Sequence, residues 1–166
     1  LAGFARALAD GADYVLEMDC DFSHRPEDVP RLIAACEGGA DLALGSRYVP
    51  GGGTENWGLT RRLISVGGSQ YARLLLGVKF HDLTGGFKCY RRAVLERIDL
   101  AAVHSKGYAF QIETTYRTVR AGFDVVEVPI LFVDRTAGES KMSRTIFLEA
   151  VKKVPALRLD ALRGKL

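Results

Sequence analysis

The chain has 166 residues, of which 48% are hydrophobic and 26% charged, a balance typical of a globular protein with one hydrophobic core. Its 23 basic and 20 acidic residues give a net charge of +3, so the composition does not call for nucleic acid as a partner. The longest apolar runs fall well short of the roughly 20 residues that cross a bilayer. Cys20, Cys36 and Cys89 are odd in number and lack metal-binding spacing, which favours reduced thiols in a cytosolic compartment over a disulfide framework.

Hydrophobic periodicity predicts alternating helices and strands. In chain order, the predicted elements are a short helix over residues 1–8, a strand over 14–18, a helix from 26 to about 37, a strand over 41–46, a helix over 59–76, a strand over 87–90, a helix over 109–120, a strand over 125–133 broken by a proline, and a helix over 144–154. The glycine-rich segment from Pro50 to Thr54 is expected to be a mobile flap rather than a packed element. This alternation predicts an α/β fold with a mainly parallel sheet flanked by helices.

Two carboxylates follow the first predicted strand. Asp19 and Asp21 lie two positions apart where the apolar run Tyr14–Met18 ends. Taken alone, such a pair is more often a solvated acidic turn than a metal site. Its place after a buried strand, together with cations further along the chain, favours a hard divalent cation that also holds a diphosphate. Arg47 follows the next predicted strand, so we expect its guanidinium at the same edge of the sheet, with a surface ion pair as the alternative.

A polar, glycine-containing loop before the last predicted helix carries Arg135 and Lys141. An arginine fork binds two oxygens of a diphosphate, and a lysine adds a mobile point charge. Together they would stabilise the negative charge on a departing nucleotide. The alternative is that both cations pair with Asp134 and Glu139 across the loop.

Other residues have a structural and a functional interpretation. His24, beside Pro26, is more often a polar cap than a third metal ligand. The helix over 59–76 carries three arginines among apolar residues. It is either an ordinary core-facing helix or an amphipathic surface that meets lipid head groups, and the two interpretations are compatible.

Six segments of the chain resemble a known family, in order and over nearly the whole length. They are MDCDFSHRPED, LGSRYVPGG, DLTGGFKCYRR, SKGYAFQIE, EVPILFVDR and GESKMS. Together they resemble the polyprenol-phosphate mannosyltransferases, also called dolichol-phosphate mannose synthases, of the family 2 inverting glycosyltransferases. The resemblance implies a GT-A fold and a Mg²⁺ or Mn²⁺ cofactor. It also implies mannose transfer with inversion from GDP-mannose to polyprenyl phosphate, giving polyprenyl β-mannosyl phosphate and GDP.

The resemblance also assigns roles by position. It places Asp19, Cys20 and Asp21 at the metal and the diphosphate, with the two aspartates as metal ligands, and places Arg47, Arg135 and Lys141 at donor-binding positions, with Asp21, Arg135 and Lys141 in the catalytic group. Asp82 lies where hydroxyl-transferring relatives have acidic residues near the acceptor, but its sequence is also that of a turn. Ser23 stands where some relatives have Gln, and Val66 where an Arg often serves the acceptor phosphate.

The family domain begins with a strand and a nucleotide-binding segment that this chain lacks. Residues 1–166 are therefore expected to form a partial, N-terminally truncated catalytic domain with no second domain. The expected location is peripheral, at the cytoplasmic face of a membrane, with a membrane-anchoring protein as a further candidate partner. Two alternatives stay open. One is a family 2 transferase that moves glucose or another sugar to polyprenyl phosphate, and the other is a truncated binding module without catalysis.

Overall fold

The structure is a computed structural model that describes residues 1–134 and 144–166, without the side chains of residues 144–148. Its main sheet has four strands in the order β1 (Tyr14–Glu17), β4 (Lys88–Arg91), β2 (Leu42–Ser46) and β5 (Val125–Pro129). β2 and β5 pair in parallel, whereas β4 runs antiparallel to both of its neighbours. Three strands therefore share one direction, as predicted for a mainly parallel sheet. β4 lies between β1 and β2 and runs in the opposite direction.

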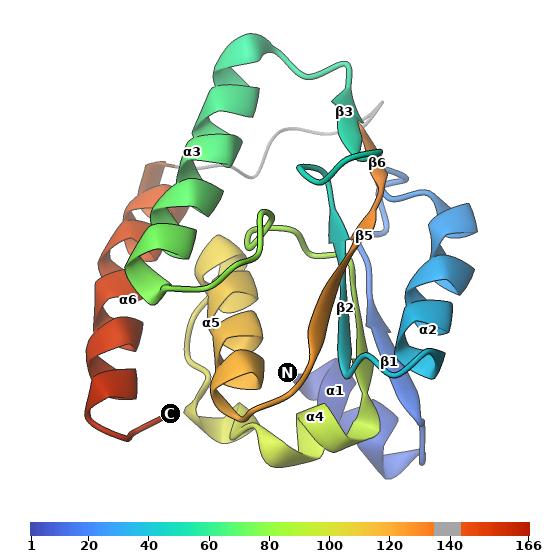
Figure 1. The fold of residues 1–166 in the computed structure, drawn as a ribbon, viewed down its shortest axis with the longest axis vertical. Helices are drawn as coiled ribbons and strands as arrows, with labels where there is room; N and C mark the ends of the chain where they lie inside the picture. The colour runs from blue at the N-terminus through green and yellow to red at the C-terminus, as the bar shows by residue number, and fades with distance from the viewer. Residues whose placement is uncertain (135–143) are drawn as a thin grey trace.

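Helices cover both faces of this sheet (Figure 1). The helical elements are α1 (Ala2–Ala9), the 3-10 turn η1 (Pro26–Asp28), α2 (Val29–Glu37), α3 (Leu59–Leu76), α4 (Arg92–Arg97), the 3-10 turn η2 (Leu100–Ala102), α5 (Gly107–Arg120) and α6 (Arg144–Leu162). In Figure 1, α2 lies on one side of the sheet and α5 on the other, with α3 and α6 beyond α5. Of these elements, α4 and η2 were not predicted from the sequence.

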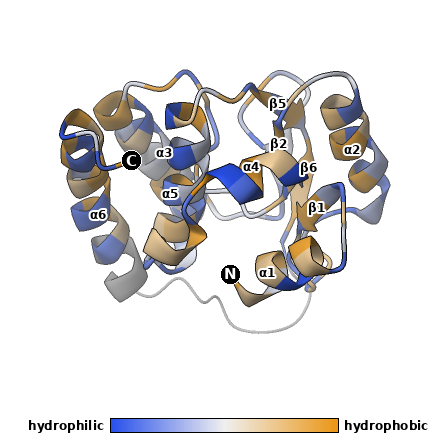
Figure 2. Ribbon diagram, turned by 90° about the horizontal axis from the view of Figure 1, so that it is seen from below, coloured by the Kyte–Doolittle hydropathy of each residue, from blue (hydrophilic) through white to orange (hydrophobic). Residues whose placement is uncertain are grey.

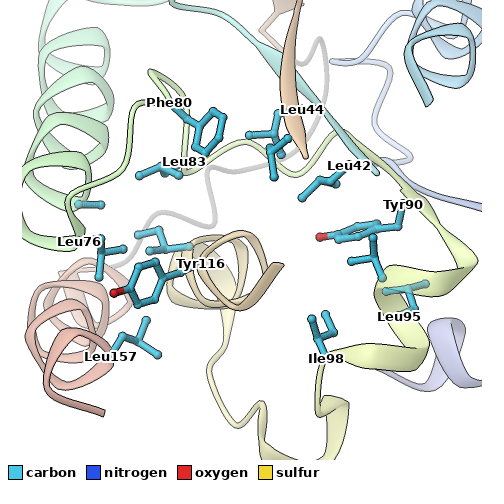
Figure 3. Close-up of a cluster of buried hydrophobic side chains, with 14 of the residues drawn as sticks. Leu42, Leu44, Leu76, Phe80, Leu83, Tyr90, Leu95, Ile98, Tyr116 and Leu157 are labelled. Carbon is cyan, nitrogen blue, oxygen red and sulfur yellow. The ribbon is translucent and has the colours of Figure 1, made fainter. Parts of the chain in front are cut away.

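Alternation along the strands divides the core between the two faces. Leu42 and Leu44 lie near Tyr90 on the α5 side, and the same core continues past α5 to Tyr116, which lies near Leu76 and Leu157 (Figure 3). Ala43, which lies between Leu42 and Leu44, belongs instead to the cluster under α2. Successive side chains of a strand point to opposite faces, so apolar residues at every position give a sheet that is buried on both sides. Figure 2 accordingly shows largely hydrophobic strands between the helical layers.

The segment from Pro50 to Thr54 is not the unpacked flap that its glycines predicted. Gly53–Glu55 forms β3, which pairs in parallel with β6 (Leu131–Val133). A Cβ atom at Gly52 would lie 2.5 Å from the backbone oxygen of Ser46, so only glycine fits this close approach. Glycine here serves tight packing rather than mobility.

The last helix is longer than predicted. The sequence placed its end near Val154, but α6 continues to Leu162 with Pro155 inside it. Leu157 and Ala161, beyond the proline, are buried in the main core. Their burial outweighs the local cost of a proline in a helix.

Lys88 is a buried cation in β4, and it links the sheet to α5. Its side chain is 1% exposed, and Nζ donates a hydrogen bond of 2.7 Å to the carbonyl oxygen of Gln111. Burial disfavours the charged form and lowers the pKa of Lys88 to about 8, although the charge of Glu17 acts in the opposite direction. The folded protein therefore releases this proton more readily than the unfolded chain.

The pH dependence of stability should reveal this lysine. Between the folded pKa of about 8 and the ordinary value of 10.5, the unfolded chain binds more protons, so stability should rise with pH. We expect the free energy of unfolding of the natural protein to gain up to roughly 3 kcal/mol over that of Lys88→Met across this window. Denaturant unfolding of both proteins between pH 7 and 10.5 measures the gain, with Lys152→Met, an exposed site on α6, as the control. Parallel curves would contradict the expectation.

Candidate functional site

The two predicted carboxylates lie in one short turn after β1. Asp19 is exposed and Asp21 is half-buried. The backbone N–H and the hydroxyl of Ser23 donate hydrogen bonds of 3.1 and 2.5 Å to Oδ1 of Asp21. Phe22, between them, has a φ of 60°, a left-handed conformation that is strained for a phenylalanine. The chain therefore turns sharply here, and Ser23 fixes the orientation of the Asp21 carboxylate.

These carboxylates suit a hard divalent cation. Both offer oxygen donors, which Mg²⁺ and Mn²⁺ accept. Among residues 1–134 and 144–166, no group of three or more His, Cys, Asp or Glu residues gathers at a point where it could hold a metal. Asp19 and Asp21 would therefore supply part of a coordination shell, and a bound ligand or water would supply the rest. A metal that also binds a diphosphate requires such a partly open coordination shell, because the phosphate oxygens occupy the remaining positions.

His24 is buried under the acidic turn rather than exposed at a helix end. Only 2% of the residue is accessible. Its ring stacks on Phe87 with centroids 4.8 Å apart and meets the edge of Phe132 at 5.1 Å. Nδ1 accepts a hydrogen bond of 3.2 Å from the backbone N–H of Asp19. Nδ1 is thus engaged within the turn, which agrees with a structural interpretation of His24.

Burial lowers the pKa of His24, and four nearby charges act on it as well. Those charges belong to Asp19, Arg47, Asp21 and Asp82. Charged residues from three separate segments of the chain are therefore close enough to act on one ring. This arrangement agrees with the expectation that the ends of β1 and β2 meet at one edge of the sheet.

Arg47 forms a buried ion pair instead of the surface pair considered from the sequence. Its Nε and Nη2 donate to the two carboxylate oxygens of Asp82 at 2.6 and 2.7 Å, and Nη2 also donates to Thr84 at 3.0 Å. Arg47 is 7% exposed and Asp82 is 1% exposed. Burial opposes both charges, but the pairing outweighs it, so the pKa of Asp82 falls and that of Arg47 rises. Both groups are therefore charged at neutral pH.

Glu127 of β5 holds the loop that carries Asp82, a role that sequence reasoning missed. Its Oε1 accepts from the hydroxyl of Ser46 at 2.7 Å and from the backbone N–H groups of His81 and Asp82 at 2.9 and 3.0 Å. Oε2 lies 2.9 Å from Nδ1 of His81. The available signal was a single acidic residue in the otherwise apolar stretch from Val125 to Pro129.

A cavity of about 360 Å³ lies between α3, α5 and α6. It is lined by Trp57, Arg61, Ile64, Ser65, Gly67, Gly68, Tyr71, Thr84, Tyr108, Ile112, Ala150, Val151 and Val154. Thr84 is also a partner of Arg47, so the cavity reaches the buried ion pair. Arg61 lies over the Trp57 ring at 4.1 Å and pairs with Asp134 at 2.5 Å. An apolar chamber with charged residues at one end suits a ligand with an apolar tail and an anionic head.

Of the three remaining predicted site residues, the structure describes one. Cys20 is exposed within the acidic turn as a free thiol. Arg135 and Lys141 lie outside the described residues, so their assignment stays a prediction. Among the described residues, no helix combines the length and the hydropathy needed to cross a membrane.

Comparisons with known proteins identify the family to which the chain belongs. The family model for glycosyl transferase family 2 matches residues 1–99. The polyprenol monophosphomannose synthase of Mycolicibacterium smegmatis is 52% identical over 168 residues, which cover 99% of this chain and 63% of that protein. The undecaprenyl-phosphate mannosyltransferase of Micrococcus luteus is 49% identical over 170 residues, which cover 100% of this chain and 70% of that protein. The chain therefore spans about two thirds of the length of these relatives.

Solved structures show the same fold at lower identity. Glucosyl-3-phosphoglycerate synthase from Mycobacterium tuberculosis aligns with a TM-score of 0.57 and 20% identity, over 95% of this chain and 53% of that one. Its complex with Mn²⁺, UDP and glucosyl-3-phosphoglycerate aligns with a TM-score of 0.54 and 18% identity, over 98% and 52%. The fold is that of the GT-A glycosyltransferases. The chain belongs to glycosyl transferase family 2, and its resemblance to the polyprenol-phosphate mannosyltransferases of that family is confirmed.

Proposed function

We propose that the full protein transfers mannose from GDP-mannose to a polyprenyl phosphate with inversion, releasing GDP and polyprenyl β-mannosyl phosphate. The observation that carries this proposal is the cavity, which is apolar along α3 and α6 and reaches the Arg47–Asp82 pair through Thr84. The names of the two relatives, a polyprenol monophosphomannose synthase and an undecaprenyl-phosphate mannosyltransferase, support the same reaction class.

On the donor side, Asp19 and Asp21 would hold Mg²⁺ or Mn²⁺ together with the diphosphate. The metal would neutralise charge on the departing GDP. The exposed Cys20 would contribute through its backbone. Arg47 has Nε and Nη2 engaged by Asp82 and Thr84, and within the described residues Nη1 has no hydrogen-bond partner. We assign Nη1 to a phosphate oxygen of the bound substrates.

Arg135 and Lys141 complete the donor assignment. Their charges would meet the same diphosphate, which supports their place with Asp21 in the catalytic group. A polyprenyl phosphate is already an anion at neutral pH, so its attack on the anomeric carbon needs no general base. Asp82, whose two carboxylate oxygens accept hydrogen bonds from Arg47, need not take a proton. Positioning and charge stabilisation then account for the reaction.

On the acceptor side, the cavity would take the first isoprene units. The outer part of α3 exposes Leu59, Leu63 and Leu74 by 72%, 63% and 79%, and it also carries Arg62. Apolar side chains beside a cation suit the surface of an anionic bilayer. We therefore place the protein at the cytoplasmic face of a membrane as a peripheral enzyme, either alone or with an anchoring partner.

Filling the cavity should weaken acceptor binding alone. Gly68 lines the cavity, and a Cβ atom there would meet nothing within 4 Å, so Gly68→Leu extends into open space. We expect its KM for polyprenyl phosphate to rise roughly tenfold or more while the KM for GDP-mannose is unchanged. Steady-state kinetics with each substrate varied in turn measures both constants. The matched control is Gly3→Leu in α1, where a Cβ atom is equally unobstructed. If Gly68→Leu and Gly3→Leu have equal KM values for polyprenyl phosphate, the acceptor binds outside this cavity.

Donor choice needs a direct test on the full-length protein. The protein is incubated with Mn²⁺, polyprenyl phosphate and one of GDP-mannose, GDP-glucose, UDP-glucose or UDP-N-acetylglucosamine, and the lipid products are identified. We expect mannolipid from GDP-mannose only. A glucolipid product would favour the alternative that the protein transfers glucose or another sugar to polyprenyl phosphate. No product from any donor would favour the non-catalytic binding module.

A further inference from the structure

We propose that His24 is a positioning residue for the acidic turn, which it holds in the shape that binds the metal. This inference rests on the proposed function, because it concerns the same two carboxylates. His24 is the acceptor for the backbone N–H of Asp19, at 3.2 Å from Nδ1. The bond closes a loop of six residues, from 19 to 24, that contains both acidic side chains. It fixes the peptide plane from which the Asp19 carboxylate extends.

The Asp19 N–H needs such an acceptor because the sheet no longer provides one. The pairing of β1 with β4 ends at Glu17 opposite Lys88, two residues before Asp19. A backbone N–H that leaves a strand has to find another partner or face water. His24 supplies the partner from within the turn. A neutral imidazole that accepts at Nδ1 carries its proton on Nε2, so the bond also defines the tautomer.

The ring itself is held by two strands that are far apart in the sequence. Phe87, next to β4, stacks on it with an interplanar angle of 23°, and Phe132 of β6 meets it at 84°. The N–H of Val133, the next residue of β6, donates a hydrogen bond of 3.1 Å to the carbonyl oxygen of Ser23. The acceptor nitrogen is therefore fixed relative to the sheet, and the turn is anchored at two adjacent residues.

Ser23 acts on the second carboxylate as His24 acts on the first. The serine orients the Asp21 side chain through Oδ1, while the histidine orients the Asp19 backbone. Ligands that are oriented before the metal arrives lose less freedom on binding. The exposed turn, with its strained Phe22, would otherwise sample other shapes.

Two substitutions separate the hydrogen bond from the packing. His24→Phe keeps an aromatic ring between Phe87 and Phe132 but removes the acceptor. His24→Asn restores an acceptor oxygen at the position of Nδ1 but loses most of the ring. The exposed His104 provides the control, His104→Phe. Three properties of the full-length protein are measured: Mn²⁺ affinity in the presence of GDP, the exchange rate of the Asp19 amide without ligands, and the melting temperature.

We expect the two variants to fail in opposite ways. His24→Phe should bind Mn²⁺ with GDP about tenfold more weakly and exchange the Asp19 amide much faster, while its melting temperature stays near that of the natural protein. His24→Asn should keep most of the affinity and of the amide protection but melt several degrees lower, by about 4 °C or more. A histidine with a packing role alone would give the reverse order of affinities, with Asn worse than Phe.

The inference is overturned if His24→Phe binds Mn²⁺ with GDP as the natural protein does, or if its Asp19 amide stays protected. A natural protein that binds no Mn²⁺ in the presence of GDP would instead overturn the proposed function and the metal-binding part of this inference with it. Amide exchange without ligands then still decides whether His24 holds the turn.

Discussion

Asp21→Ala should lower the metal-dependent turnover of the full-length protein by about 10²-fold or more. The substitution removes one of two hard ligands and its charge from the proposed diphosphate site. It also leaves the Ser23 N–H and hydroxyl without the oxygen they now contact. We expect Asp19→Ala to have a similar or somewhat smaller effect. Initial rates of mannolipid formation over a range of Mn²⁺ concentrations measure the loss.

The control for these variants is Asp13→Ala, which removes an exposed carboxylate just before β1. Its turnover should match that of the natural protein, because Asp13 lies at the opposite end of the strand from the turn. Melting temperatures of all three variants show whether any loss comes from unfolding. Unchanged turnover and unchanged metal dependence in both Asp19→Ala and Asp21→Ala would make the pair a solvated turn.

The second large effect should be on stability. Asp82→Ala leaves the guanidinium of Arg47 buried without its counter-charge, and breaking such a pair costs about 3–5 kcal/mol. Denaturant unfolding should show a loss of this size in the free energy of unfolding. The double variant Arg47→Met/Asp82→Leu removes both charges and should recover much of the loss. Asp10→Ala, which breaks the exposed Arg6–Asp10 pair, should change stability by less than about 1 kcal/mol.

This pair also determines part of the acid sensitivity of the protein. The pKa of Asp82 is lower in the folded protein than in the unfolded chain, so its contribution is complete above the unfolded value of about 4. As the pH falls below that value, the unfolded chain takes up the proton first and the contribution is lost. Between pH 5 and 2, the natural protein should therefore lose stability more steeply than the double variant. Equal slopes would show that Asp82 does not contribute through its charge.

The sequence predicted most elements because their signals are local. The helix over 59–76 was predicted from its amphipathic pattern with its observed ends, and in the structure Gly77 ends it in the left-handed conformation. The same local reasoning was wrong for Gly52, where glycine serves a contact with Ser46 that no nearby residue reveals. It also ended α6 too early, because the burial of Leu157 against distant helices outweighs the proline. Predictions from local propensity were therefore wrong at the positions where contacts with distant residues determine the conformation.

The same distinction between local and long-range signals applies to the candidate site. Asp19 and Asp21 were predicted as candidate ligands because a strand that ends in two carboxylates is a pattern within a few residues. The partner of Arg47 was not assigned, because Asp82 lies 35 positions away and meets it only through the fold. The roles of His24 and Glu127 depend in the same way on contacts with β4, β6 and the loop at His81. Candidate ligand-binding residues can be proposed from a short motif, whereas the residues that contact and orient them are seen only in the structure.

The position of β4 in the sheet also has a consequence for how the protein folds. Val15 of β1 pairs with Tyr90 of β4, which is 75 positions later (90 − 15), and the rings that hold His24 are those of Phe87 and Phe132. Pairings so distant in the sequence form slowly because a long loop has to close first. During synthesis, the acidic turn emerges before Phe132 and cannot take its final shape until residue 132 has left the ribosome. The nascent chain should therefore acquire the proposed metal affinity of this turn only after residue 132 has emerged.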